Sequence, residues 1–336
     1  AAPGALEIIH ITSLLNQSLF DAMEADARGL VAVYPTNLLG WKMLGIALDH
    51  LGKNSEVVEC QRRMLALNPD DAEGWDRLGP EVADRWELIE AEIYFRRALR
   101  VNPLLASAHL NLGWVLHRQG RLQPALQCFR RSLEIDPSSC VAHLNLSVVL
   151  DELGYPAQAE AAIREALKIN PDFAQGHRSL GYLLKDQGRL DEAHASTRRA
   201  IELNPMDTAA YANLLFLLNY HPDKSAEEIF EAYQEFDARH GLPYKALWRD
   251  HQNTYDGNRR LRVGYVCATF SRHSTRYFLE PLLAHHDHRR LEVFAYSELS
   301  SVEDEFTASY RSYMDHWVPT VGMDDDTLAQ RIRDDG

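Results

Sequence analysis

Proline recurs every 34 residues through most of this chain, and this period constrains the fold more than any other feature. The series is Pro35, Pro69, Pro103, Pro137, Pro171 and Pro205. Proline lacks a backbone N–H and forces the preceding residue out of the helical region, so each of these prolines is expected to end a helix. A repeating unit of this length with one fixed helix end predicts a solenoid of stacked helical hairpins.

Other positions of the unit follow the same period. With each proline at position 32, the units are residues 38–71, 72–105, 106–139, 140–173 and 174–207. Position 8 is small in every unit, which lets the two helices approach closely; the residues are Gly45, Gly79, Gly113, Ser147 and Gly181. Position 24 is large in three units, where we expect it to fill the space between neighbours; the residues are Phe95, Phe129 and Ile163. This is the tetratricopeptide signature.

The repeats account for only part of the chain. Residues 1–37 fit the frame poorly and are interpreted as a degenerate capping repeat, whereas residues 38–218 form the array, ending with a helix over 208–218. The break is expected at Asn219–Pro222. Ser225 and Glu228 form a capping box that predicts a helix to about His240. Residues 219–260 are therefore expected to be a capping helix and a connector.

The pattern changes after residue 260, where short apolar runs alternate with helical segments. The expected strands are residues 261–270, 291–297 and 316–319, and the expected helices are residues 275–286, 303–313 and 324–333. This order is typical of a parallel α/β sheet. Because the sequence stops where a fourth strand is expected, residues 261–336 are interpreted as an incomplete Rossmann-like lobe. The predicted fold is mostly α, a tetratricopeptide superhelix followed by this partial lobe.

The turn after the first strand holds a candidate functional residue. Ligands of open α/β sheets bind beyond the carboxyl ends of strands, and Ser271–Ser274 occupy that place before a helix N-terminus. His273 is suited there to acid–base chemistry or to contact with a phosphate. The alternative is a histidine that only caps its helix.

Composition argues against several classes of function. The chain has 35 basic and 49 acidic residues, a net charge of −14, so no nucleic-acid partner is expected. It has no apolar run near the roughly 18 residues of a membrane span, so no membrane partner is expected. Its four cysteines lack C-x-x-C spacing and are expected to be reduced, which fits a cytoplasmic protein. Three histidines around Asp287 lack metal-site spacing, and no metal is expected; they are His285, His286 and His288.

Several motifs of the α/β segment resemble a known family. They are Leu261–Val266, His273-Ser274, Tyr277-Phe278, Glu280 and His286-Asp287. Behind a tetratricopeptide array, they are similar to the first catalytic half of the SPINDLY-like glycosyltransferases, within the protein O-GlcNAc transferase family. The resemblance covers the whole chain in architecture, but its specific motifs lie in residues 261–336.

The resemblance implies an enzyme that moves a sugar from a nucleotide-sugar donor to Ser or Thr hydroxyls of proteins, with no metal or other cofactor. The implied donor is UDP-GlcNAc, although Ser274 follows the SPINDLY branch and leaves fucose open as the sugar. The loop histidine of the family maps onto His273, which becomes the implied catalytic residue. The family's nucleotide-binding residues lie in a second lobe, so this chain alone is expected to be inactive.

The resemblance also implies a groove that binds protein or peptide acceptors. In O-GlcNAc transferases an asparagine ladder at position 6 lines the concave surface, and Asn111, Asn145 and Asn213 hold that position here. A carboxamide both donates and accepts, so it can pair with a peptide backbone of any sequence. Ser179 interrupts the ladder and the first two units lack it, which predicts a short groove. The alternative is a row of solvated polar residues.

Two functions from different classes therefore stay open. One is a protein O-glycosyltransferase, of which this chain carries the acceptor-reading array and part of the first lobe. The other is a non-catalytic tetratricopeptide scaffold that mediates protein–protein interaction. They differ in whether a nucleotide-binding second lobe follows residue 336.

Overall fold

The computed structural model describes residues 2–83, 88–249, 259–299 and 303–336. They form two compact units, Ala1–Ala246 and Leu247–Gly336. The division falls inside the segment predicted to hold a capping helix and a connector.

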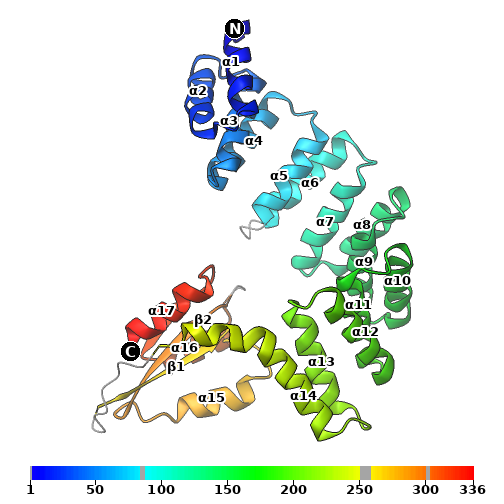
Figure 1. Cartoon of the computed structure of the whole chain (residues 1–336), viewed down its shortest axis with the longest axis vertical. Helices are drawn as coiled ribbons and strands as arrows, with labels where there is room; N and C mark the ends of the chain where they lie inside the picture. Colours follow the sequence, from blue (N-terminus) through cyan, green and yellow to red (C-terminus); the bar gives the residue numbers. More distant parts are fainter. Residues whose placement is uncertain (1, 84–87, 250–258, 300–302) are drawn as a thin grey trace. The chain divides into compact units, whose positions relative to one another are not determined.

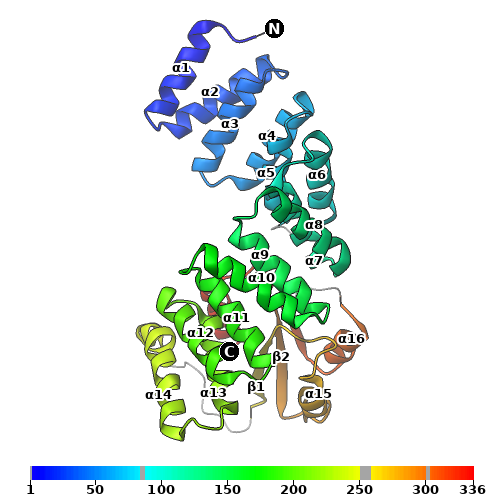
Figure 2. The same ribbon diagram turned by 90° about the vertical axis from the view of Figure 1, so that its right-hand side faces the viewer.

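Helices stacked in consecutive pairs make up the first unit (Figures 1 and 2). They are α1 (Ala5–Asn16), α2 (Phe20–Val33), α3 (Leu38–His50), α4 (Asn54–Leu67), α5 (Ala72–Ala83), α6 (Leu88–Val101), α7 (Ala106–Arg118), α8 (Leu122–Ile135), α9 (Cys140–Glu152), α10 (Pro156–Ile169), α11 (Ala174–Asp186), α12 (Leu190–Leu203), α13 (Thr208–Tyr220) and α14 (Ala226–Phe236). The mostly helical tetratricopeptide fold predicted from the period is confirmed.

In two units, glycine at position 8 is required by direct contact between the two helices of the unit. A Cβ on Gly113 would lie 2.6 Å from the ring of Phe129, and one on Gly79 would lie 2.2 Å from the ring of Phe95. Each position-24 ring therefore packs on the glycine of its own unit, besides contributing to the core shared with neighbouring helices. The prediction that position 24 only fills space between units was incomplete.

The proline carbonyl links each unit to the next one. The side-chain nitrogen at position 4 lies 2.8–3.2 Å from the carbonyl oxygen of the proline six residues earlier. The position-4 residues that make this bond are Trp41, Trp75, His109, His143 and His177. The three histidines thus make the same hydrogen bond as the tryptophans at position 4 of the earlier units.

The last two helices of the unit differ slightly from the predicted bounds, because α13 is longer and α14 ends at Phe236, before the predicted His240. α13 includes Asn219 and Tyr220, so the break begins at His221, whose backbone is extended, and not at Asn219 as predicted. α14 begins at the predicted capping box and covers α13 through an apolar cluster that includes Tyr211 and Phe236. A π-helical turn (Asp237–Gly241) and a 3-10 turn (Leu242–Leu247) follow.

The second unit is a parallel sheet with the predicted alternation of strands and helices. Its elements are β1 (Leu261–Cys267), α15 (Arg276–Ala284), β2 (Leu291–Ser297), α16 (Glu305–Ser312), β3 (His316–Pro319) and α17 (Asp325–Asp335). The strands lie side by side in the order β1-β2-β3. β1 ends three residues before the predicted Phe270, because Phe270 turns into the core beneath α15 and α16.

The two faces of this sheet are covered by different helices. α15 and α16 pack with Val293 and Ala295 on one face, whereas α17 packs with Phe294 and Tyr296 on the other. Alternate residues of β2 thus point to opposite faces, as the pleat of a strand requires. In the described part of the chain, no helix is long and apolar enough to cross a membrane.

Candidate functional site

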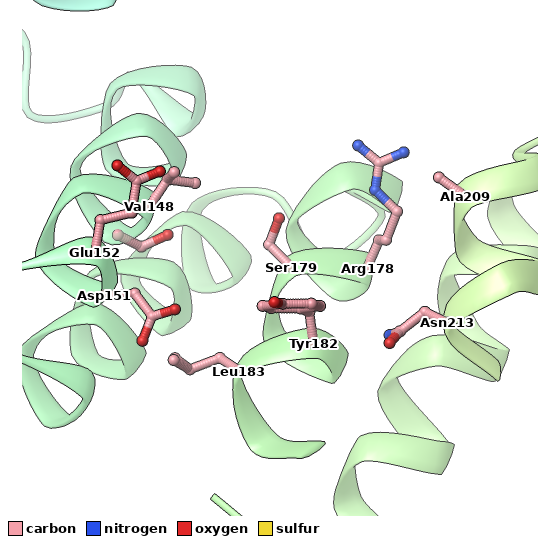
Figure 3. Close-up of a pocket in the computed structure, with 10 residues that line it drawn as sticks. Val148, Asp151, Glu152, Arg178, Ser179, Tyr182, Leu183, Ala209 and Asn213 are labelled. Atoms are coloured by element: carbon pink, nitrogen blue, oxygen red, sulfur yellow. The ribbon is translucent and has the colours of Figure 1, made fainter. Parts of the chain in front are cut away.

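A pocket of about 360 Å³ lies between the first helices of three successive repeats, α9, α11 and α13 (Figure 3). Its lining residues are Ser147, Val148, Asp151, Glu152, Arg178, Ser179, Tyr182, Leu183, Ala209 and Asn213. All of them lie on the first helices of these repeats. Because stacked repeats place equivalent helices side by side, the pocket belongs to a surface shared by consecutive units.

The predicted ladder asparagines lie on this series of first helices, and all three are partly buried. Asn213 lines the pocket, and its Nδ2 donates to Thr197 Oγ1 at 3.2 Å. Asn111 Nδ2 donates to Asp76 Oδ1 at 3.0 Å. Asn145 lies between them on α9. Two of the carboxamides therefore have a donor engaged within the protein, and no group among the described residues donates to their carbonyl oxygens.

The arginine of the pocket is held by a carboxylate. Arg178 Nη1 donates to both carboxylate oxygens of Asp207, at 3.0 and 2.8 Å. Asp207 in turn accepts the backbone N–H groups of Ala209 and Ala210 and so caps α13. The positive charge of Arg178 is thus neutralised by the residue that begins the next helix.

Two carboxylates on the last turn of α9, those of Asp151 and Glu152, line the pocket, and Figure 3 shows them pointing in different directions. Glu152 Oε1 lies 2.9 Å from His117 Nε2. Burial, followed by repulsion from the carboxylates of Asp186 and Glu152, raises the pKa of Asp151 above its usual range. Burial and neighbouring negative charges disfavour the ionised form of this carboxyl group, so a cation close to it would stabilise that ionised form.

An aromatic ring forms the middle of the pocket. Tyr182 is 50% exposed, and the ammonium group of Lys185 lies 4.1 Å from its ring centroid and 4.9 Å from that of Phe216. Both rings are at position 9 of their units. Sequence reasoning missed this position, although the 34-residue period shows that it is large and apolar or aromatic in four successive units; the residues are Trp114, Val148, Tyr182 and Phe216. Sequence reasoning also missed the carboxylates at positions 12 and 13 of their unit, Asp151 and Glu152.

The predicted loop histidine lies at the surface of the second unit. His273 is exposed, and its Nδ1 accepts the backbone N–H of Thr275 at 3.2 Å and also contacts Thr275 Oγ1. Since Nδ1 is an acceptor, the neutral ring carries its proton on Nε2. The loop is tied to α16, because Arg272 N donates to Asp304 Oδ2 at 2.8 Å. His273 is therefore oriented as a hydrogen-bond donor through Nε2.

The three histidines that follow the C-terminal end of α15 have separate partners. His285 Nδ1 lies 2.7 Å from Pro281 O, and His286 Nε2 lies 2.8 Å from Tyr265 OH. His288 Nδ1 lies 3.0 Å from Asp315 Oδ2. Within the described ranges, no group of His, Cys, Asp and Glu side chains is arranged to hold a metal ion.

Family models match both units of the chain. Residues 106–139 and 144–208 match tetratricopeptide repeat models, and residues 238–336 match the model of glycosyl transferase family 41.

Curated relatives match only part of this chain. A probable UDP-N-acetylglucosamine–peptide N-acetylglucosaminyltransferase SPINDLY of Arabidopsis thaliana is 29% identical over 129 residues, which is 37% of this chain and 14% of that protein. The related probable transferase SEC of the same plant is 28% identical over 79 residues, covering 24% of this chain and 8% of that protein. The matched region is thus a small part of these relatives.

A solved structure matches a larger share of this chain. A mutant O-GlcNAc transferase of Thermobaculum terrenum superposes with a TM-score of 0.60 and 27% identity, covering 69% of this chain and 44% of that one. Together with the family model and the curated relatives, this match confirms the resemblance to the O-GlcNAc transferase and SPINDLY-like family.

Proposed function

We propose that this chain carries the acceptor-binding repeats and part of the first catalytic lobe of a protein O-glycosyltransferase. The observation that supports this most is the match of residues 238–336 to glycosyl transferase family 41, directly behind a tetratricopeptide array. The match to the Thermobaculum terrenum O-GlcNAc transferase covers 69% of this chain. Fold alone would not support an activity, because one fold hosts many functions.

The proposed reaction transfers N-acetylglucosamine from UDP-GlcNAc to a Ser or Thr hydroxyl of a protein. The names of the plant relatives, which are probable UDP-N-acetylglucosamine–peptide N-acetylglucosaminyltransferases, support this donor. Fucose is the alternative sugar, because Ser274 follows His273 as in the SPINDLY branch. No further cofactor is proposed.

The repeats are proposed to hold the acceptor as an extended polypeptide. The carbonyl oxygens of Asn111 and Asn213 are free to accept backbone N–H groups, since their Nδ2 atoms donate within the protein. Asn145 is proposed to do the same one repeat apart from Asn111. Such contacts bind the backbone and leave the side chains of the acceptor to be selected by other residues.

His273 is proposed to stabilise the reacting groups in the complete enzyme. Its Nδ1 is occupied by Thr275 N–H, so the neutral ring offers a proton at Nε2 to a donor phosphate or to the acceptor oxygen. Action as a base would first require Nε2 to lose that proton. Hydrogen-bond donation is therefore proposed as the main role and proton transfer as the secondary one.

A transfer assay with the enzyme expressed from the complete reading frame tests this proposal. The enzyme is incubated with Ser/Thr-containing peptides and either UDP-GlcNAc or a fucose nucleotide, and the product peptides are measured by mass spectrometry. We expect addition of N-acetylhexosamine from the first donor. Peptide binding without transfer from either donor would instead support the scaffold function.

A further inference from the structure

We propose that Asp304 is a positioning residue for the transfer reaction, because its carboxylate holds the backbone of the loop that carries His273. This inference rests on the role proposed for His273 and adds the residue at the start of α16 on which that role depends. Asp304 would act through the loop and would not touch the donor, the acceptor or the reacting atoms.

The two carboxylate oxygens of Asp304 have different partners. Oδ1 accepts the backbone N–H groups of Phe306 and Thr307, at 3.0 and 2.9 Å, and so caps α16. Oδ2 accepts the backbone N–H of Arg272 at 2.8 Å. Ser, Thr or Asn caps a helix with one oxygen, so the cap itself does not require a carboxylate. The second acceptor is needed for the bond to the loop.

The charge of Asp304 strengthens this bond. The Thr307 N–H, followed by the Arg272 N–H, outweighs burial and lowers the pKa of Asp304 below its usual range. The carboxylate is therefore ionised near neutral pH. Hydrogen bonds to an ionised acceptor are about twice as strong as those between neutral groups.

A second contact anchors the same loop to the first turn of α16. Thr307 Oγ1 donates to the carbonyl oxygen of Phe270 at 2.8 Å, and both residues are fully buried. The ring of Phe270 packs against Tyr310 and Trp317, with centroids 5.4 and 5.2 Å apart. The chain is thus held at residue 270 by the core and at residue 272 by Asp304.

His273 lies directly after these two anchors and shortly before α15. Its carbonyl oxygen accepts the Arg276 N–H at 3.1 Å, and its Nδ1 accepts the Thr275 N–H. These local bonds orient the ring within the loop, and the bond to Asp304 sets the position of the loop beside α16. A misplacement of about 1 Å can lower a reaction rate by about 10²-fold, so loss of that bond should reduce turnover.

Asp304→Asn in the complete enzyme separates the two roles of this carboxylate. Asparagine keeps one acceptor oxygen and is a favoured N-cap, but its Nδ2 cannot accept the Arg272 N–H. We expect kcat to fall about tenfold or more, with an acceptor KM and a melting temperature close to native. Backbone hydrogen exchange in residues 270–275, measured by mass spectrometry, should become faster. Native kcat in the folded variant would overturn the positioning role.

Asp324→Asn is the matched control. Asp324 caps α17 through the Thr327 N–H at 2.7 Å, and α17 packs on the opposite face of the sheet from α16. D324N removes the same charge from a helix cap of the same unit, so it should keep native kcat and native exchange in residues 270–275. Equal losses of kcat in D304N and D324N would assign the effect to charge or stability and contradict the inference.

A double variant tests whether Asp304 acts through His273. We expect D304N to lower kcat in the native background and to have little further effect in the H273A background, because the group that it positions is already absent there. Additive losses would show that Asp304 affects the reaction by another route, which would also contradict the inference.

The outcomes also separate this inference from the proposed function. Native exchange of the loop in D304N would overturn the anchor and leave the proposed function intact. A complete enzyme that transfers no sugar would contradict the proposed function and, with it, the role of Asp304 in transfer, whatever the exchange shows.

Discussion

At the scale of single residues, the repeat is held together by two contacts that recur at the period. A ring at position 24 packs on a glycine at position 8, and a side-chain nitrogen at position 4 meets a proline carbonyl. The sequence shows that position 8 is small, but it does not reveal which side chain packs on that residue. The ring contact itself belongs to two units, because position 24 is Gln61 beside Gly45, Ile163 beside Ser147 and Thr197 beside Gly181.

The ring contact predicts opposite effects for one substitution at equivalent glycines. Gly113→Ala places a Cβ 2.6 Å from Phe129 and should destabilise the array by about 1–3 kcal/mol through overpacking. Gly45→Ala meets its nearest atom, Cys60 Cβ, at 3.6 Å and should be neutral or stabilising by up to about 1 kcal/mol through helix propensity. Urea unfolding of the two variants checks this, and equal effects would contradict it.

The proline hydrogen bond predicts which residues can replace a histidine of the repeat. His143→Phe leaves the Pro137 carbonyl without its donor and should cost about 1 kcal/mol. His143→Trp should restore most of that loss, because Trp75 makes the same bond at 2.8 Å in its own unit. Thermal melting of both variants measures the difference. A Trp variant less stable than the Phe variant would show that the bond does not contribute.

At the scale of elements, helices and strands were predictable where a pattern sets their ends, and less so elsewhere. The proline and the capping box of Ser225 and Glu228 fixed helix ends correctly. The end of α13 was missed by two residues, because Asn219 and Tyr220 break the repeat pattern without breaking the helix. The end of β1 was missed because an apolar run does not reveal that Phe270 leaves the strand for the core.

One carboxylate joins the elements of the sheet and predicts a pH dependence. Burial opposes the charge of Asp315, but the Val293 N–H, His288 and Arg260 outweigh it and lower its pKa to about 2. A lowered pKa stabilises the folded unit above the ordinary value of about 3.8, and this stabilisation is lost as the pH falls toward about 2. It amounts to about 2 kcal/mol near neutral pH.

Asp315→Asn should remove that stabilisation. Amide hydrogen exchange at Val293, whose N–H donates to Asp315 Oδ2 at 2.8 Å, should show an opening free energy lower by about 2 kcal/mol near neutral pH. Urea unfolding of the α/β unit should show native and variant stabilities converging as the pH approaches about 2. A difference that persists at that pH would contradict the assignment to this carboxylate.

At the scale of the whole molecule, the period reveals the array and the change of pattern after residue 260 reveals the α/β unit. The resemblance supplied His273 and the ladder asparagines. The charged and aromatic pocket was not predicted. Asp151, Arg178 and Tyr182 lie on two different helices, and only the stacking of successive repeats brings them together. A residue-by-residue reading of repeat positions 9, 12 and 13 would have found its members, but not the neutralisation of Arg178 by Asp207.

The central claim is that the repeats bind the acceptor while the α/β unit takes part in the chemistry. Steady-state transfer kinetics of the complete enzyme test this claim most directly. His273→Ala should lower kcat by about 10²-fold with little change in acceptor KM, because a donor to the reacting groups is lost. N111A/N145A/N213A should raise the acceptor KM by about tenfold and leave kcat close to the native value. Native kinetics in both folded variants would contradict this division of roles.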